Sequence, residues 1–270
     1  MMIACVASIV ILSSHETRMD ANSKDDPGLE IAPRRPVTPA PYSIYLTFDD
    51  GPTEGSRFVT DLSLRDSIRL NVFVVGGNVF RNGRNRTLLQ AYIDDPFIEI
   101  GNHSFTHAEQ HYRRYFRRPD LVLADFDRNR DSLHLNNGLA RLPGRNVFRI
   151  DGLTRDDPED AREAADTLAA KGYRVFGWDL EWRQKAAEGV EAHTGSEMFS
   201  VAQGMLGGGK TFRPNQIVLL LHDREMRDSA FRAQLDSFIN MARRDGRFAF
   251  RRLSEYETPG DGRTDRVRPL

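Results

Sequence analysis

Cysteine is almost absent from this 270-residue chain. The single Cys5 excludes a disulfide within the chain and any zinc site made of cysteine pairs, so His, Asp or Glu would have to hold a metal ion. An excess of charge is also absent, because 38 Lys and Arg residues face 39 Asp and Glu residues and the formal net charge is −1. With no overall attraction for a polyanion, we expect no nucleic-acid partner.

The apolar run at the N-terminus is too short to span a bilayer, so we expect no stable membrane span. Residues 1–12 have the length of a signal-peptide core, but no Lys or Arg precedes them and no small-x-small cleavage site is obvious. An atypical signal and a disordered apolar tail both fit this pattern. We expect export to the periplasm, the cell envelope or the medium, and a cytoplasmic location stays open.

Composition divides the chain into three parts. Residues 13–41 are polar and then rich in proline, which favours an extended tether over a helix or strand. We therefore expect one folded domain over residues 42–257, preceded by the apolar run and tether (1–41) and followed by a polar tail (258–270).

Within the domain, short apolar runs alternate with helical patterns, which predicts an α/β fold with parallel strands. We expect strands over residues 43–48, 71–75, 97–100, 173–177, 217–221 and 248–253, and helices over residues 56–70, 86–94, 158–171 and 229–243. Polar clusters follow three of these strands directly, at the edge where α/β folds build their active sites. The clusters are Asp49-Asp50, Gly101-Asn102-His103 and His222-Asp223.

The first two clusters contain the residue types of a metal site. Asp49 and Asp50 are neighbours, so their side chains diverge and one can bind a cation while the other serves as a base; a solvated turn is the alternative. His103 and His107 are four residues apart, and a helical turn would place both imidazoles on one face. With Asp50 they make a set of two histidines and one carboxylate, which leaves positions for water and substrate. His111 leaves an all-histidine site open.

Other conspicuous residues have simpler interpretations. The Arg-rich run 113–118 is typical of a solvated helix face, and His134 is expected on a helix with a structural or exposed role. The stretch 207–210, Gly-Gly-Gly-Lys, lacks the strand that precedes a phosphate-binding loop, so we interpret it as a flexible turn.

Five motifs in order resemble the polysaccharide deacetylases of carbohydrate esterase family four, the NodB-like domain. The resemblance extends from about Tyr42 to Tyr256, and it implies a distorted, incomplete (β/α) barrel. The motifs are Thr47-Phe48-Asp49-Asp50-Gly51-Pro52, His103-Ser104-Phe105-Thr106-His107, Arg141-Leu142-Pro143-Gly144, Trp178 to Trp182, and Leu220-Leu221-His222-Asp223.

The resemblance also implies roles for the first two motifs. Asp50, His103 and His107 would hold one divalent ion, usually zinc in this family, although other first-row ions suit the same ligands. The ion would activate a water molecule and polarise the acetyl carbonyl. Asp49 would be the general base, and Arg141 would orient it.

The later motifs would serve the sugar and the leaving group. His222 would act as general acid towards the sugar amine, and a backbone N–H near Gly144 would stabilise the oxyanion together with the ion. Trp182 and Leu220 would form the wall of the pocket for the acetyl methyl group.

Two positions depart from the family pattern. Gly144 stands where the third motif usually has an aromatic residue, so an aromatic wall of the sugar site is expected to be lost. Glu181 stands where the fourth motif usually has Asp before Trp182, and either Glu181 or Asp179 could orient His222. We therefore expect activity with an altered substrate choice.

The resemblance thus implies a metal-dependent hydrolase that removes N-acetyl groups from a polysaccharide containing N-acetylhexosamine and releases acetate. An O-acetyl esterase is the alternative on the same scaffold, and a retired enzyme that only binds carbohydrate is the alternative from another class. A metal-dependent phosphohydrolase would need more cationic groups or a second metal.

Overall fold

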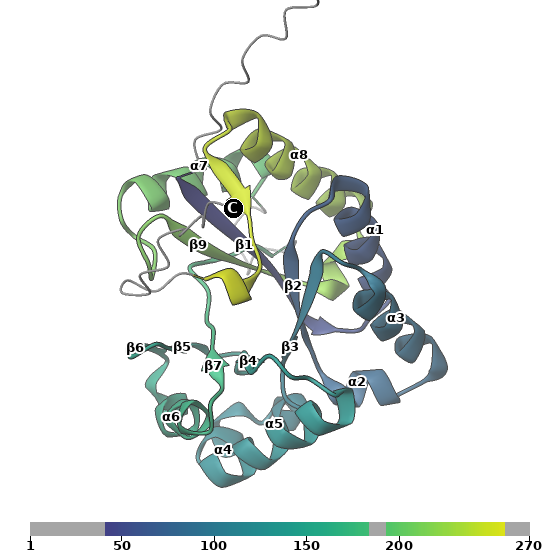
Figure 1. Ribbon diagram of the computed structural model, residues 1–270, viewed down its shortest axis with the longest axis vertical. Helices are drawn as coiled ribbons and strands as arrows, with labels where there is room; N and C mark the ends of the chain where they lie inside the picture. The colour runs from purple at the N-terminus through teal and green to yellow at the C-terminus, as the bar shows by residue number, and fades with distance from the viewer. Residues whose placement is uncertain (1–40, 184–192, 257–270) are drawn as a thin grey trace, which may run out of the picture. The chain divides into compact units, whose positions relative to one another are not determined.

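A ten-stranded sheet lies at the centre of the computed structural model, which describes residues 41–183 and 193–256 (Figure 1). The predicted N-terminal run, most of the tether and the C-terminal tail lie outside the described residues. The strands are β1 (Tyr42–Gly51), β2 (Leu70–Val74), β3 (Ile98–Asn102), β4 (Leu139–Ala140), β5 (Asn146–Ile150), β6 (Leu153–Asp157), β7 (Arg174–Val175), β8 (Leu180–Glu181), β9 (Gln216–His222) and β10 (Phe248–Phe250).

The strand order shows an incomplete barrel. Nine strands follow the order β6-β5-β7-β4-β3-β2-β1-β9-β8, and β10 pairs with β1 outside this path. Only β5 pairs antiparallel with its neighbours β6 and β7; the other pairs along the path are parallel. The end strands β6 and β8 do not pair with each other within the described residues, so the curled sheet stays open. The predicted α/β class and incomplete barrel are confirmed.

Helices cover the outer side of the sheet. In Figure 1, α1 and α3 lie beside β2, while α4, α5 and α6 lie beside β4 and β7. No described helix is both long and apolar enough for a membrane span. The α-helices are α1 (Ser56–Asp66), α2 (Gly76–Phe80), α3 (Gly83–Asp94), α4 (Tyr112–Phe116), α5 (Pro119–Leu133), α6 (Arg162–Ala170), α7 (Gly195–Gly207) and α8 (Ser229–Asp245), and short 3-10 turns are η1 (His107–Gln110), η2 (Glu159–Ala161), η3 (Asp223–Arg227) and η4 (Leu253–Glu255).

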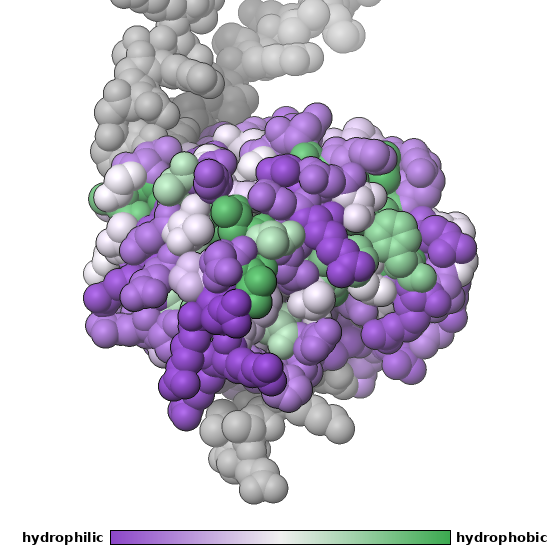
Figure 2. All heavy atoms as spheres, turned by 90° about the horizontal axis from the view of Figure 1, so that it is seen from below, coloured by the Kyte–Doolittle hydropathy of each residue, from purple (hydrophilic) through white to green (hydrophobic). Residues whose placement is uncertain are grey.

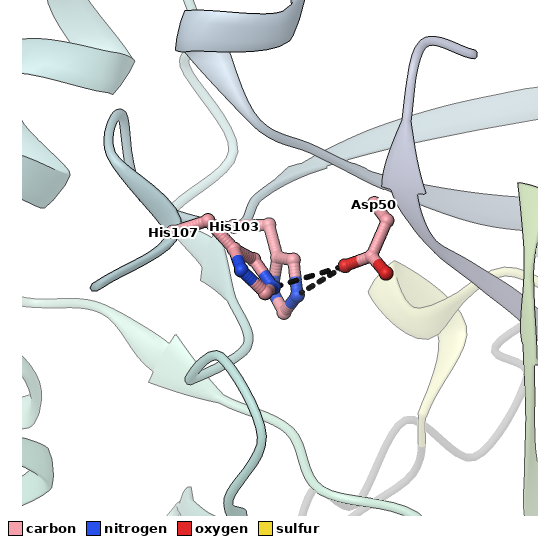
Figure 3. A group of neighbouring side chains, drawn as sticks. All are labelled: Asp50, His103 and His107. Carbon is pink, nitrogen blue, oxygen red and sulfur yellow. Dashed lines mark ion pairs between the residues drawn. The ribbon is translucent and has the colours of Figure 1, made fainter. Parts of the chain in front are cut away.

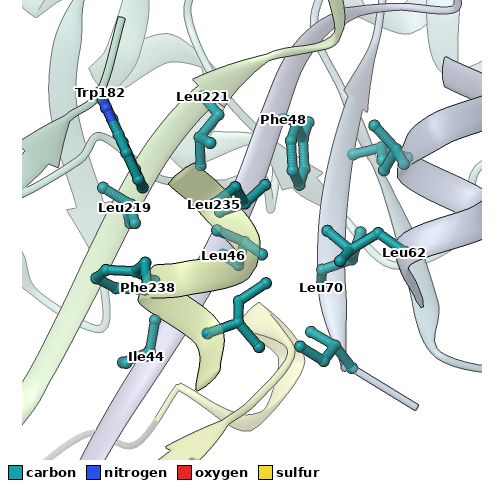
Figure 4. Close-up of a cluster of buried hydrophobic side chains, with 14 of the residues drawn as sticks. Ile44, Leu46, Phe48, Leu62, Leu70, Trp182, Leu219, Leu221, Leu235 and Phe238 are labelled. Carbon is teal, nitrogen blue, oxygen red and sulfur yellow. The ribbon is translucent and has the colours of Figure 1, made fainter. Parts of the chain in front are cut away.

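The alternation of side chains along β1 explains how the fold presents the site. Ile44, Leu46 and Phe48 point to the main apolar core, where they pack with residues of β2, β9 and α8 (Figure 4). Because successive side chains of a strand point to opposite faces, Thr47 and Asp49 point to the inner side of the curled sheet. Burial of the apolar face therefore fixes the direction of the Asp49 carboxylate.

Several predicted boundaries were wrong. The helix expected over 56–70 ends at Asp66, because Ser67 adopts the left-handed conformation, and Leu70 begins β2 instead. The helix expected to contain His134 ends one residue earlier, and His134 is its left-handed C-cap. The expected strands 173–177 and 248–253 are shorter, at 174–175 and 248–250.

Candidate active site

The three polar clusters meet at the carboxyl edge of the sheet. Asp49 and Asp50 are among the last residues of β1, and His222 is the last residue of β9, directly beside Asp49 in the strand register. His103 follows β3, whose partner β2 pairs with β1. The parallel arrangement therefore brings together residues that are more than 100 positions apart in the sequence.

One carboxylate and two imidazoles form a compact group of metal-ligand type (Figure 3). Asp50 Oδ1 lies 3.0 Å from His107 Nε2 and 3.5 Å from His103 Nε2. Within the described residues this is the group whose ligand atoms lie within 4.8 Å of one another, and His111 is not part of it. The all-histidine alternative is therefore not supported by the geometry.

A loop, rather than a helical turn, brings the two histidines together. Ser104 and His107 both have positive φ values, so residues 103–107 do not form the helical turn that would place both imidazoles on one helix face. Hydrogen bonds fix the loop instead: the Ser104 backbone N–H donates to Asn102 Oδ1 at 2.9 Å, and the His107 N–H donates to Ser104 Oγ at 3.0 Å. Thr106 is held from α5, since its N–H and hydroxyl both donate to Asp125 Oδ2.

The environment of His103 prepares its Nε2 atom for a cation. Its Nδ1 lies 2.9 Å from the Arg141 carbonyl oxygen; because a carbonyl only accepts, Nδ1 must carry the proton. Burial alone would lower the pKa of His103, but the charges of Asp49 and Asp50 and the interaction with Asp50 raise it, so the protonated ring pairs with Asp50. A cation would take the place of the Nε2 proton and bind the lone pair that faces Asp50. Burial alone would raise the pKa of Asp50, but hydrogen bonds and charge interactions with His103 and His107 hold it well below its usual range.

This donor set fits a divalent ion. Two imidazole nitrogens and one carboxylate oxygen already converge, the carboxylate stays ionised, and the three side chains are at most 18% exposed. Three protein ligands leave a coordination position open, as catalytic metal sites require. The ligand types suit zinc and other first-row ions alike.

Asp49 is held apart from this group by a buried arginine. Arg141 is fully buried, and its Nη1 donates to Asp49 Oδ1 at 2.9 Å and to Thr47 Oγ1 at 2.8 Å. Its other nitrogens donate to the Phe176 and Gly177 carbonyl oxygens. The second carboxylate oxygen, Oδ2, points towards His103 Nε2 at 3.7 Å. The predicted pairing of Arg141 with Asp49 is therefore present.

Neither carboxylate predicted to orient His222 contacts it. Asp179 accepts hydrogen bonds from the backbone N–H groups of Phe212 and Val218, and Glu181 pairs with Arg183. The carboxylate nearest to His222 Nδ1 is Glu225, at 3.9 Å, and Nδ1 has no hydrogen-bond partner among the described residues. Burial lowers the pKa of His222. The sequence contained a signal for Glu225, because it lies three residues after His222 in the same turn.

The residue after His222 packs against the end of the first motif and binds α1 and α3. Asp223 is fully buried, and its Oδ2 accepts hydrogen bonds from the Ser56 hydroxyl and, at 2.7 Å, from the Tyr92 hydroxyl. A Cβ atom on Gly51 would lie 2.5 Å from this oxygen, which explains the glycine there. Burial raises the pKa of Asp223 to about 7.

The cavity of the site, about 310 Å³, has a different aromatic wall from the predicted one. Leu220 and Gly144 line it as expected, but Trp182 is buried in the core against Phe231 and Phe238. Trp178 and Tyr112 line the cavity instead. A Cβ atom on Gly144 would lie 3.3 Å from the Tyr112 ring, so the glycine leaves room for an aromatic side chain supplied by α4.

Comparison with known proteins points to the same family as the sequence motifs. The family model "Polysaccharide deacetylase" matches residues 37–141, a range that contains the Asp pair and the His pair. The resemblance to the polysaccharide deacetylases is confirmed. Among curated proteins, none matches this sequence significantly.

Solved structures show the same fold as this deacetylase-like domain. A polysaccharide deacetylase from Bacillus cereus is 19% identical with a TM-score of 0.55, and the match covers 80% of this chain and 94% of that one. The catalytic domain of a peptidoglycan N-acetylglucosamine deacetylase from Eubacterium rectale is 16% identical with a TM-score of 0.58, covering 80% and 90%. A mutant of a carbohydrate esterase family 4 pseudoenzyme is 15% identical with a TM-score of 0.55, covering 81% and 68%.

Arg224 is a positively charged residue of the site that the sequence did not indicate. Arg224 Nη1 lies 2.7 Å from Asp50 Oδ2, while Oδ1 of the same carboxylate faces the imidazoles. The Arg224 side chain is 56% exposed, so this ion pair lies at the entrance of the site. Nothing in the spacing of Asp50 and Arg224, which are 174 residues apart, could have indicated the contact.

Proposed function

We propose that this protein is a metal-dependent hydrolase that removes N-acetyl groups from an N-acetylated polysaccharide and releases acetate. The observation that carries the proposal is the pair of neighbouring carboxylates with separate surroundings. Asp50 Oδ1 faces both imidazoles, whereas Asp49 is bound by Arg141 through Oδ1 and faces only His103, at 3.7 Å, through Oδ2. A solvated turn would need neither arrangement, whereas metal-assisted hydrolysis of an amide uses both a metal site and a base.

A divalent ion held by Asp50, His103 and His107 would polarise the acetyl carbonyl and lower the pKa of a water molecule. Asp49 takes the proton of the attacking water, because its Oδ2 is turned to the metal side while Arg141 fixes its Oδ1. The new C–O bond gives a tetrahedral intermediate, and the C–N bond then breaks. Acetate and the sugar amine are the products.

The leaving amine needs a proton, which we assign to His222. Its ring lies at the end of β9 beside Asp49 in register and lines the same cavity as Asp49 and Asp50. A pKa lowered by burial makes the protonated imidazole a stronger acid, which favours proton transfer to the amine. Leu220, Trp178 and Tyr112 line the remaining wall, where an acetamido sugar would lie.

Two other functions have specific support. The same site could hydrolyse an O-acetyl ester, because the attack on the carbonyl is identical. A binding protein without activity is favoured by the structural likeness to a pseudoenzyme. Against it stands the presence of base, metal group and histidine acid in one cavity.

Acetate release tests the proposal directly. The metal-depleted protein and the protein reloaded with zinc or another first-row ion are incubated with N-acetylated and O-acetylated oligosaccharides. We expect acetate only after reloading, and a loss of about 10²–10⁴-fold in kcat for Asp49→Asn. No release from any acetylated substrate, or full activity of this variant, would refute the proposal. We further propose export through residues 1–12, which cell fractionation would test.

A further inference from the structure

A second cleft adjoins the site and extends the surface on which a glycan can bind. It has a volume of about 500 Å³ and shares Asp50, His107, Gln110 and Arg224 with the cavity of the site. A polymer with one acetamido sugar in the site must pass over the neighbouring surface. The lining of this cleft therefore meets a sugar next to the one that is deacetylated.

Two arginines of this cleft have no carboxylate partner. Arg81, which follows α2, and Arg128 of α5 both line the cleft and are exposed, and neither forms an ion pair with any described residue. By contrast, the neighbouring Arg84 pairs with Glu54. Two carboxylates also line the cleft: Asp50, which is engaged by the imidazoles and Arg224, and Glu109. Arginines thus outnumber the carboxylates, and a bound divalent ion would add more positive charge.

Arg128 is held in place by the loop that carries the metal ligands. Its guanidinium carbon lies 3.5 Å from the ring centroid of Phe105, which stands between His103 and His107 in the sequence. The Phe105 ring stacks in turn on Phe80, with centroids 6.0 Å apart. A stacked guanidinium keeps its N–H groups at the ring edge available for an acceptor. The cation is therefore positioned relative to the site rather than free in solvent.

Another cleft that borders the site also has arginines without an ion-pair partner among the described residues. A third cleft of about 430 Å³ shares Gln110 and Tyr112 with the cavity of the site. Arg113 and Arg114 line this cleft, are exposed and form no ion pair with any described residue. The Arg-rich run 113–118, predicted to be a solvated helix face, thus contributes two arginines to this cleft. The cavity of the site and its two adjoining clefts are together called the groove.

We infer that the substrate is an acidic N-acetylated glycan, whose carboxylate or phosphate groups on flanking sugars bind Arg81 and Arg128 in one adjoining cleft and Arg113 and Arg114 in the other. This inference rests on the proposed function. The chain as a whole has a net charge of −1, so the excess of cations at the groove is local. Guanidinium groups match carboxylate and phosphate oxygens in pairs, whereas a neutral glycan would leave their charge unused.

The face of the domain that carries α4 and α5 is mostly polar. Figure 2 shows the end of the domain at which α4 and α5 lie in Figure 1, and hydrophilic side chains cover most of that face. The apolar patches on it are small and scattered. A hydrophobic partner would need a larger continuous apolar area.

The test compares hexamers that share one β-1,4-linked N-acetylated backbone and differ in their charged substituents. A β-1,4-linked hexamer of N-acetylglucosamine is the neutral substrate, and the peptide-free hexamer that alternates N-acetylglucosamine with N-acetylmuramic acid carries carboxylates on the same backbone. A 6-O-phosphorylated hexamer of N-acetylglucosamine separates phosphate from carboxylate as the anionic group. For the zinc-loaded full chain we expect kcat/KM to be at least about tenfold higher for one acidic hexamer than for the neutral one. This ratio should fall as salt rises from about 20 to 500 mM, because screening weakens exposed ion pairs.

Arginine variants link the ratio to the groove. The double variant Arg81→Gln/Arg128→Gln should lower the acidic-to-neutral ratio about fivefold or more, mainly through KM. The matched control Arg84→Gln/Arg86→Gln removes two exposed arginines of α3 outside the clefts and should leave the ratio unchanged. Equal kcat/KM for all three hexamers, or an equal effect of both double variants, overturns the inference while acetate release still supports the proposed function.

If no acetate is released, binding measurements test the acidic-glycan inference separately from the proposed reaction. The dissociation constants of the three hexamers are then measured by calorimetry for the wild type and both double variants. Tighter binding of an acidic hexamer that is lost in Arg81→Gln/Arg128→Gln supports the groove even when the proposed reaction fails. Absence of such a preference overturns the acidic-glycan inference as well.

Discussion

The buried Asp223 makes stability depend on pH in a direction opposite to most carboxylates. Its side chain is inaccessible to solvent, its Oδ1 has no hydrogen-bond partner among the described residues, and burial raises its pKa to about 7. The unfolded chain would titrate the same group near 3.8. Between these values the unfolded state has lost the proton while the folded state still holds it. The titration of Asp223 therefore lowers the free energy of unfolding as the pH rises across this window.

The size of the effect follows from the same two pKa values. A difference of about three pH units between the folded and unfolded states corresponds to about 4 kcal/mol, at about 1.4 kcal/mol per unit. The stabilising contribution is fully present below about pH 4 and is lost as the pH rises to about 7. In Asp223→Asn the amide imitates the protonated acid and can still accept from the Ser56 and Tyr92 hydroxyls. The variant should lack this loss and should be more stable than the wild type at neutral pH.

Urea unfolding of both proteins from pH 4 to pH 8, in the presence of a metal chelator, measures the difference. Taking the difference between the two proteins cancels the titration of the carboxylates that they share. We expect it to be near zero at pH 4, to grow in favour of Asp223→Asn, and to level off above pH 7. A difference that does not change with pH, or a variant that is less stable at pH 8, would refute the reasoning.

Three further outcomes follow from the charges of the site. Arg141→Ala should lower the free energy of unfolding by about 3–5 kcal/mol, because it leaves the Asp49 carboxylate buried without a partner; urea unfolding checks this, and Arg141→Met combined with Asp49→Asn should recover part of the loss. If protonated His222 is the acid, the alkaline limb of the kcat/KM profile reports its pKa. Glu181 raises and Arg224 lowers this pKa, so Glu181→Gln should move the limb to lower pH and Arg224→Gln to higher pH. Removing Arg224 should also strengthen zinc binding in calorimetry, since a cation next to Asp50 disfavours a second one.

Six of the ten strands could be predicted, because their apolar residues are close together in the sequence. The run Ile217–Leu221 became β9, and the alternation in residues 43–48 became the centre of β1. Helix α7 was missed because Gly195, Gly204 and Gly207 are poor helix formers; its Thr194 capping box and tertiary packing override that preference. The antiparallel hairpin of β5 and β6 was missed because charged residues dominate its second strand.

The charged and metal-ligand-type residues of the site could be predicted, but its aromatic wall and many of its contacts could not. The metal group and the Arg141–Asp49 pair are present as expected from the motifs. The contacts of Trp182 and Asp179 depend on packing between distant elements, and no local pattern records which aromatic ring or N–H group will be nearest. The compensation of Gly144 by Tyr112 is of the same kind, since it requires a loop and α4 to meet in space.

The hydrogen bonds of Arg141 also determine how the site can open. Its guanidinium binds β1 through Thr47 and Asp49 and the segment after β7 through two carbonyl oxygens, and its own carbonyl holds the ring of His103. Proteins open locally in cooperative units, and loops usually open at low cost. Here Asp49, the proposed base, and the imidazole of His103 share a residue with the buried sheet. The catalytic centre is therefore expected to lose its structure together with the whole domain, and its amide protons should exchange as slowly as those of the core.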